Sequence, residues 1–117
     1  MAPIQMPNEE RVVYSDAYLT IDYARQAVTL DSQPVELTSK EFAMLAFLAG
    51  RAGEILPREA LLAAVWGYND QVRTRTLDVH LARIRKKLGP LGRRYLETVF
   101  GSGCRFQPQT ASIRSVA

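Results

Sequence analysis

The sequence has few of the residues that build catalytic and metal centres. It holds one cysteine and one histidine among 117 residues. A lone cysteine excludes an internal disulfide, so we expect a reducing, cytoplasmic setting and a small buried apolar role for Cys104. His80 has no cluster of other ligand types, which predicts no metal site. There is no nucleophile with a matching base and no phosphate-cradling P-loop, so we expect no enzyme, no catalytic residue and no cofactor.

Long apolar runs are missing as well. No run approaches the roughly 18 residues that a membrane span needs, and the first residues lack the basic-then-apolar order of a signal peptide. We therefore expect no membrane contact. The composition, 47% hydrophobic and 23% charged, is ordinary for one globular domain. We place that domain at residues 12–107, with a linker or added tail at 1–11 and a disordered tail at 108–117.

Charge is distributed unevenly along the chain. Residues 73–105 carry nine basic and two acidic side chains, whereas residues 1–72 carry five basic and ten acidic ones; Arg114 brings the net charge to +3. One part of the molecule therefore attracts a polyanion while the other repels it, and this orients an encounter with nucleic acid.

Residues 74–88 give the most specific pattern. At about 100° per residue, one side of a helix collects four apolar residues: Leu77, Leu81, Ile84 and Leu88. The opposite side collects cations and small apolar groups: Arg75, Val79, Ala82, Lys86 and, at its edge, Arg83. A merely solvated face would mix more Glu with Lys. Cations suit phosphates and guanines and small apolar groups suit thymine methyls, so we expect a DNA recognition helix.

The remaining elements are short. Residues 18–23, 27–30 and 35–37 have strand-like composition, with a tight turn at 31–34, and predict a small antiparallel sheet of three or four strands. Residues 54–56 are a candidate for one further, very short strand.

Two helices precede the basic one. Thr38 and Glu41 form a capping box that opens a helix ending near Gly50. Pro57 begins the next helix, and Gly67 stops it. Two β segments around residues 101–103 then predict a hairpin. The order indicates an α+β winged helix-turn-helix, with an N-terminal antiparallel sheet, three helices, the third in the major groove, and a C-terminal β-hairpin wing over residues 95–106.

These residues resemble the DNA-binding effector domain of OmpR/PhoB-type response regulators. Four ordered blocks with compatible spacing carry the resemblance: residues 37–42, 57–67, 75–88 and 97–106. The resemblance implies that the protein is a transcription regulator of a two-component system, binding promoter DNA as two head-to-tail copies on direct repeats. It also implies that a phosphoacceptor receiver normally comes first. None is present in this chain, so we expect the C-terminal half alone. No long apolar stripe is left over, so we expect a monomer in the absence of DNA.

The resemblance and the helix faces together suggest individual roles. We assign base-edge contacts to four residues: Val79, Ala82, Arg83 and Lys86. We assign phosphate contacts to six more: Trp66, Arg73, Arg75, Thr76, Arg85 and Lys87. For each base-reading residue the alternative is a phosphate contact, since half or more of such contacts go to the backbone. For Trp66 the alternative is core packing, and for the flanking cations it is an ion pair within the helix.

The wing is assigned to Thr98, Gly101, Ser102 and Arg105. The family hairpin commonly reads Thr-Val-Arg-Gly-x-Gly-Tyr, whereas Phe100 and Cys104 replace its arginine and tyrosine here. Charge is then expected from Arg105 or from the pair at 93–94, and Phe100 is expected to pack on the hairpin base or on sugar edges.

One alternative function stays open. A winged helix can be a protein-docking module, for example on RNA polymerase through the loop at residues 68–73, with only non-specific affinity for DNA. The two functions differ in a measurable way, because a DNA reader loses affinity linearly in log salt.

Overall fold

The computed structural model describes residues 13–67 and 74–110. It divides into two compact units, one formed by the chain up to residue 36 together with residues from 109 onward, the other by residues 37–108. The linker predicted for residues 1–11, and all but the first residues of the predicted tail, lie outside the described residues.

The first unit contains a four-stranded antiparallel sheet in the order β1-β2-β3-β4. Its strands are β1 (Val13–Ser15), β2 (Leu19–Asp22), β3 (Ala27–Leu30) and β4 (Gln33–Val35). Leu19 and Ile21 alternate with half-buried residues along β2 and are fully buried, as is nearly all of Val28 in β3. The sheet thus hides one face, as the period-two pattern predicts.

The turn between β3 and β4 is shorter than predicted. We expected a turn over residues 31–34, but β4 begins at Gln33, which already pairs with β3. Asp31 and Ser32 have φ values of 52° and 68°. Positive φ at both central residues is what a two-residue type I′ hairpin requires. Pro34 is tolerated because β4 lies at the edge of the sheet.

The chain remains hydrogen bonded at Gln109, the second residue of the predicted tail. The amide of Gln109 donates to Asp16 Oδ2 at 3.0 Å, and its carbonyl accepts from the amide of Ala17 at 3.2 Å. Asp16 also accepts from the amides of Tyr18 and Leu19, each at 3.0 Å. This one carboxylate therefore organises the β1–β2 turn and holds the returning chain to it.

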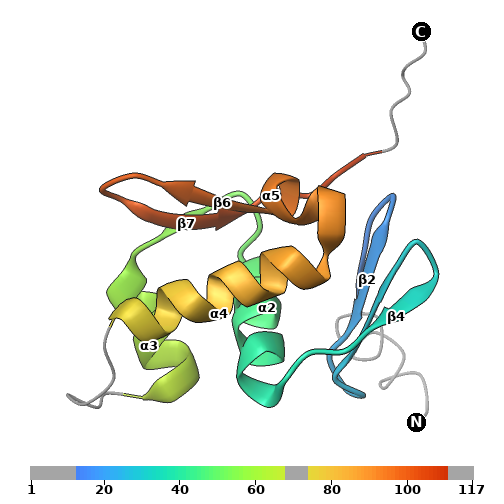
Figure 1. Cartoon of the computed structure of the whole chain (residues 1–117), viewed down its shortest axis with the longest axis horizontal. Helices are drawn as coiled ribbons and strands as arrows, with labels where there is room; N and C mark the ends of the chain where they lie inside the picture. The colour runs from blue at the N-terminus through green and yellow to red at the C-terminus, as the bar shows by residue number, and fades with distance from the viewer. Residues whose placement is uncertain (1–12, 68–73, 111–117) are drawn as a thin grey trace, which may run out of the picture. The chain divides into compact units, whose positions relative to one another are not determined.

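The second unit holds the helices and the wing. Its elements are α2 (Ser39–Gly50), β5 (Ile55–Leu56), α3 (Arg58–Trp66), α4 (Thr74–Lys87), the 3₁₀ helix η2 (Gly89–Leu91), α5 (Gly92–Tyr95), β6 (Leu96–Val99) and β7 (Gly103–Phe106). Figure 1 shows α4 running between the β6–β7 hairpin and the helices α2 and α3. The three predicted helices are present, and η2 and α5 are additional short turns that the sequence did not predict.

The predicted helix boundaries are confirmed. In the capping box the Glu41 amide donates to Thr38 Oγ1 at 3.2 Å, and the Thr38 amide donates to Glu41 Oε1 at 2.9 Å. Helix α3 follows Pro57 and ends at Gly67, whose φ of 80° lies in the left-handed region that glycine favours.

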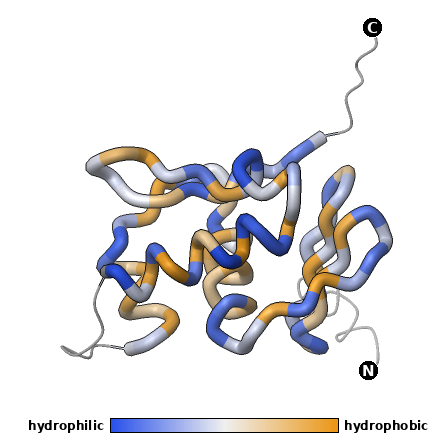
Figure 2. Tube along the Cα trace, in the orientation of Figure 1, coloured by the Kyte–Doolittle hydropathy of each residue, from blue (hydrophilic) through white to orange (hydrophobic). Residues whose placement is uncertain are grey.

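The core of this unit is built around the apolar side of α4. Its four predicted core residues are at most 2% exposed: Leu77, Leu81, Ile84 and Leu88. Figure 2 shows the alternation of hydrophobic and hydrophilic positions along this helix. Helix α2 adds Phe42, Leu45 and Leu48, and the centroids of the buried rings of Tyr95 and Phe106 lie 5.5 Å apart.

Strand β5 extends the β6–β7 hairpin of the wing into a three-stranded sheet in the order β5-β7-β6. Strand β5 confirms the very short strand predicted at residues 54–56, since its Leu56 pairs with Cys104 of β7. Cys104 is 1% exposed, in line with the predicted buried role. Gly103 is required here, because a Cβ would lie 2.0 Å from the Leu56 carbonyl oxygen and its φ is 145°.

Candidate nucleic-acid interface

The predicted reading face of α4 is exposed to solvent. The four residues assigned to base edges are all exposed: Val79, Ala82, Arg83 and Lys86. Arg75, in the first turn of α4, is exposed too, whereas Thr76 beside it is half-buried. None of the three exposed cations, Arg75, Arg83 and Lys86, forms an ion pair or hydrogen bond with another described residue. The opposite side of the same helix is fully buried, so the helix fixes the direction of these side chains.

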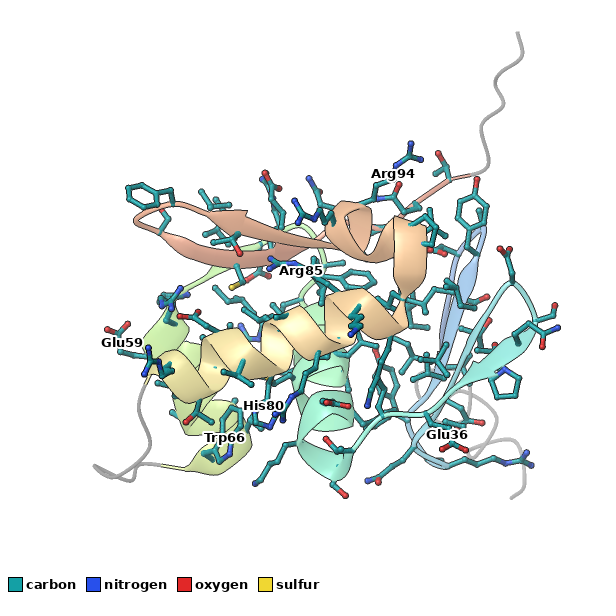
Figure 3. All side chains as sticks on the ribbon, viewed as in Figure 1. Glu36, Glu59, Trp66, His80, Arg85 and Arg94 are labelled. Carbon is teal, nitrogen blue, oxygen red and sulfur yellow. The ribbon has the colours of Figure 1, made fainter. Side chains whose placement is uncertain are left out.

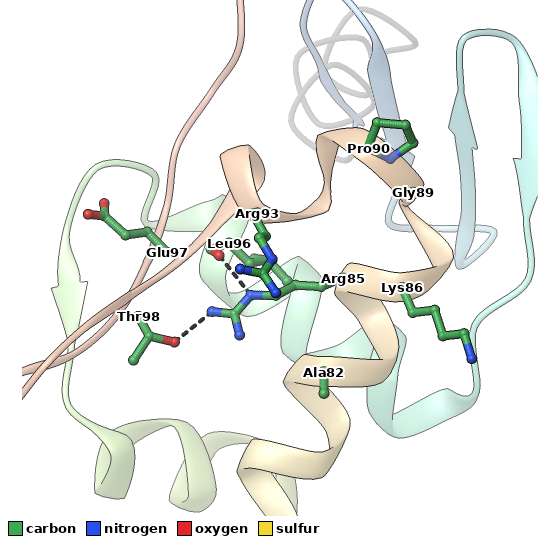
Figure 4. A pocket seen from close by; sticks show the side chains of 9 residues that line it. All are labelled: Ala82, Arg85, Lys86, Gly89, Pro90, Arg93, Leu96, Glu97 and Thr98. Carbon is green, nitrogen blue, oxygen red and sulfur yellow. Dashed lines mark hydrogen bonds between the residues drawn. The ribbon is translucent and has the colours of Figure 1, made fainter.

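Arg85 joins α4 to the wing. Its Nε donates to the Leu96 carbonyl at 2.9 Å, and its Nη2 donates to Thr98 Oγ1 at 2.6 Å (Figure 4). These bonds take two of the five N–H donors of the guanidinium. The hydroxyl of Thr98, a predicted wing contact, is therefore already an acceptor in the free protein. Sequence reasoning missed this link because the two partners lie on different elements.

Lys87 has an internal partner, although we expected it at a phosphate. Its Nζ lies 2.6 Å from Glu41 Oε1, and the Glu41 side chain is 1% exposed. Burial by itself would raise the pKa of Glu41. The hydrogen bonds from Lys87 and from the Thr38 amide, with the positive charges of Lys87 and His80, outweigh burial and lower that pKa below its ordinary value. A charged Glu41 thus needs Lys87 where it is.

Trp66 lies close to two basic side chains. The rings of Trp66 and His80 meet edge to face, with centroids 4.9 Å apart and ring planes at 81° (Figure 3). Lys40 Nζ lies 5.8 Å from the Trp66 ring centroid. His80 Nδ1 is 2.8 Å from the Thr76 carbonyl oxygen. Within residues 13–67 and 74–110, no acceptor bonds the indole N–H. The ring therefore packs while its N–H stays available.

Asp78, the only acidic residue of α4, is paired. It bonds Arg58 of α3, and the two form an ion pair. The partner lies on the neighbouring helix, 20 positions earlier in the sequence. The charge of Asp78 is thereby offset near the start of the cationic face.

The charge expected from Arg105 is largely offset within the wing. Its Nη2 and Nε lie 2.7 and 3.0 Å from Glu97 Oε1, to which Gln107 also donates at 3.2 Å. Gly101 and Ser102 form the exposed tip of the hairpin. Phe100 beside them is 99% exposed, so the expectation that it packs on the hairpin base is wrong. Phe100 is the first of the three residues that join β6 to β7, and no neighbouring surface covers its ring.

A groove of about 670 Å³ separates the C-terminal half of α4 from β6. Figure 4 shows the residues that line it: Ala82, Arg85, Lys86, Gly89, Pro90, Arg93, Leu96, Glu97 and Thr98. Three of these are cations, from α4 and α5. The sequence offered Arg93 only as a substitute for wing charge, and nothing in its pattern places it beside α4.

Some predicted sites are not described. Arg73, which we assigned to a phosphate, lies outside the described residues, as does the whole loop at 68–73, the candidate surface of the alternative docking function. In the part of the chain that the structure does describe, no helix has the length and apolarity to cross a membrane. Across the same residues, no group of three His, Cys, Asp or Glu side chains could hold a metal ion.

The sequence matches a known family. The family model described as "Transcriptional regulatory protein, C terminal" matches residues 32–106. The transcriptional regulatory protein VxrB of Vibrio cholerae is 38% identical over 106 residues, which are 91% of this chain and 41% of VxrB. The chain thus spans about two fifths of the length of this relative.

Solved structures of response regulators are similar to this chain in fold and in sequence. Response regulator DrrB of Thermotoga maritima, an OmpR/PhoB homologue, has a TM-score of 0.76 and 34% identity, covering 91% of this chain and 50% of DrrB. The RstA DNA-binding domain of Klebsiella pneumoniae, solved in complex with the RstA box, has a TM-score of 0.74 and 36% identity. That match covers 83% of this chain and 98% of the RstA domain.

Proposed function

Because the chain belongs to the OmpR/PhoB family of transcriptional regulatory C-terminal domains, we propose that it reads double-stranded promoter DNA with α4 in the major groove. Family membership puts the chain among transcription regulators rather than enzymes. The RstA domain, which covers most of this chain in fold, was solved on its DNA box, and we carry double-strand binding over from it.

The exposed face of α4 is the observation that carries this proposal. It presents three cations without a described partner together with Val79 and Ala82, and its other side is sealed in the core. In the major groove, Arg83 and Lys86 would donate to guanine O6 and N7, while Val79 and Ala82 would contact thymine methyls. A solvated surface helix gains nothing from unpaired cations interleaved with small apolar groups.

Phosphate contacts fall around this face. Arg75 and Thr76 begin α4, where one strand of the duplex would pass, and the indole N–H of Trp66 is free to donate to a phosphate. Arg73 stays in this set as a sequence-based expectation. We take Lys87 out of it, because a phosphate contact would leave the buried Glu41 carboxylate without its partner. Arg85 acts first as the positioning residue between α4 and β6, with its spare donors toward the groove.

The wing completes the interface beside the helix. Its exposed tip, Gly101 and Ser102, has small side chains and can approach the sugar-phosphate backbone of DNA closely. Arg85 holds Thr98 at a fixed distance from α4. Arg105, which bonds Glu97, contributes less positive potential than its charge implies. The ring of Phe100 would rest on sugar edges.

We propose that the protein acts as the output domain of a two-component response regulator, preceded by a receiver, and that two copies pair head to tail on direct repeats. Without DNA we expect a monomer. The exposed large apolar residues among those described are scattered over different elements: Val13, Ile55, Val79 and Phe100. Sedimentation of the isolated chain at micromolar concentration tests this, and a stable dimer without DNA contradicts it.

Selection of bound sequences from random duplexes tests the main proposal. We expect enrichment of one motif, recurring as a direct repeat, and an affinity that falls linearly in log salt. The competing function is a protein-docking module that uses residues 68–73 on RNA polymerase. It predicts weak duplex binding and no enriched motif, and that outcome would overturn sequence-specific reading.

A further inference from the structure

We infer that the groove between α4 and β6 binds a backbone phosphate of the duplex, and that Arg93 is the cation that holds it. This inference rests on the proposed DNA-binding function and adds a contact to it. The sequence did not assign Arg93 to phosphate, and the groove lies at the end of α4 opposite to Arg75.

The charges lining the groove favour an anion. Arg85, Lys86 and Arg93 face it, with Glu97 as the one carboxylate among its lining residues. Glu97 Oε1 already accepts from Arg105 and Gln107, and Figure 4 shows its carboxylate directed away from Arg93. Arg93 itself is exposed and forms no ion pair or hydrogen bond with a described residue. Cations that share an open groove repel one another, and an anion between them relieves that repulsion.

The walls of the groove are fixed in advance. Arg85 bonds β6 at two points, which holds the wing against α4. On the other side, α5 lies so close to α4 that a Cβ on Gly92 would come within 2.2 Å of the Arg85 carbonyl oxygen. Arg93 follows Gly92 directly, so its backbone cannot drift away from the groove. A preformed site loses little entropy on binding, which favours a specific contact over a diffuse one.

The spacing along α4 suits a duplex. Arg75 and Lys86 are 11 residues apart, which corresponds to about 16 Å at the rise of an α-helix. The major groove is about 12 Å wide. A helix that fills it therefore brings its two ends to the two backbone strands. Arg75 would hold one DNA strand, and the protein groove with Arg93 would hold the other. The two contacts would fix how deeply the reading residues between them enter the major groove.

Arg94 provides a matched control for Arg93. Both are exposed arginines of α5, and only Arg93 lines the groove (Figures 3 and 4). We would measure the affinity of wild type, Arg93→Ala and Arg94→Ala for the selected duplex and for a scrambled one, between 50 and 200 mM salt. Far-ultraviolet circular dichroism checks the fold of each variant.

Arg93→Ala should lower the slope of log affinity against log salt by about one on both duplexes. The wild-type advantage over this variant would then shrink about threefold to fourfold across that salt range. Arg94→Ala should leave the slope unchanged, and Arg93→Lys should keep it. Equal slope changes in the two alanine variants would overturn the inference, because they would reveal only a diffuse field.

Neutral phosphates locate the contact. A methylphosphonate is placed at one position at a time in the selected duplex. At one position the methylphosphonate should lower the affinity of wild type and of Arg94→Ala, but should not lower the affinity of Arg93→Ala any further. A second position should show the same insensitivity for Arg75→Ala, and the two positions should lie on opposite strands. If every position weakens Arg93→Ala as much as wild type, Arg93 does not hold a phosphate. Failure of wild type itself to bind duplex DNA is a different result and would contradict the proposed function instead.

Discussion

Lys87 at the end of α4 and Glu41 in the first turn of α2 form an ion pair of 2.6 Å across 46 positions of sequence. The same Glu41 carboxylate accepts the Thr38 amide that closes the capping box. One buried side chain therefore starts α2 and anchors the last turn of α4. The position of α4 therefore depends on a charge that lies outside the face proposed to read DNA.

Replacing Lys87 should affect stability rather than DNA binding. Lys87→Met leaves the buried carboxylate with one bond fewer, and we expect a loss of about 1–3 kcal/mol in the free energy of unfolding. The loss stays below that of a fully buried pair because the Lys87 side chain is 37% exposed. Lys86→Met is the control, since it should leave the urea midpoint unchanged and weaken DNA binding. The reverse pattern would mean that Lys87 contacts phosphate.

The Glu41 carboxylate predicts a component of acid sensitivity. Its pKa in the folded protein lies below the ordinary 4.5, so it stabilises the fold above that pH. As pH falls through the lowered pKa, the folded state takes up the proton and the stabilisation disappears. The stability difference between wild type and Glu41→Gln, from urea unfolding between pH 3 and 7, should be largest near neutrality and shrink below about pH 4.5. A difference independent of pH would contradict this.

Arg83 and Arg75 should differ in what they contribute to affinity. Arg83 lies in the middle of the exposed face, and Arg83→Ala should cost about 1–3 kcal/mol on the selected site and relax the choice of base at one position. Arg75→Ala should weaken binding to all sequences about equally and lower the salt slope by about one. Titration of both variants on selected and scrambled duplexes separates the two. If Arg83→Ala weakens both duplexes to the same extent, Arg83 holds phosphate.

The contact at Gly92 predicts a steric effect. Gly92→Ala would push a methyl group against the Arg85 backbone and should cost about 1–3 kcal/mol in unfolding free energy, with a loss of DNA affinity as α5 moves. Gly50→Ala, where a Cβ meets nothing within 4 Å, should be neutral or stabilising because alanine favours helix. Thermal unfolding of the two variants compares them directly. Equal effects would mean that α5 shifts to accommodate the added methyl group at little cost in unfolding free energy.

Phe100 predicts an unusual wing. Because its ring is 99% exposed, Phe100→Ala should leave the unfolding midpoint nearly unchanged. Phe100→Arg should tighten binding, chiefly to duplexes flanked by A·T-rich segments with a narrow minor groove, which attracts arginine. Affinities for one core site with A·T-rich or G·C-rich flanks provide the measurement. The absence of any gain on A·T-rich flanks would argue against a wing tip in the minor groove.

The features that the sequence predicted are those with local causes. The two faces of α4 follow from a 3.6-residue period, and the capping box lies within four residues, so both could be read directly. The start of β4 was misplaced because Pro34 suggested a turn, whereas Asp31 and Ser32 make the turn without any glycine. The short helical turns after α4 were missed as well, since the four residues of α5 are too few to show a period.

The candidate site was predictable on α4 and not beyond it. The exposure of the proposed reading residues follows from their helical positions. The partners of Lys87 and Arg85 could not be predicted in this way. They lie 46 positions from Lys87 and 11 or 13 positions from Arg85, and only packing brings them close. The groove beside Arg93 needs the close approach at Gly92, which no composition or periodicity encodes.

The division of α4 into a sealed side and an open side has an evolutionary consequence. Val79, Ala82, Arg83 and Lys86 are exposed and lie outside the buried core. On the proposed function, substitutions there would change which operator is bound while the scaffold tolerates them. After gene duplication, a copy of this domain could acquire a new target through a few such changes and diverge from its parent's operator without first losing stability. Lys87 and Arg85, one position from the open side, would be inherited unchanged because any variant must keep the helix in place.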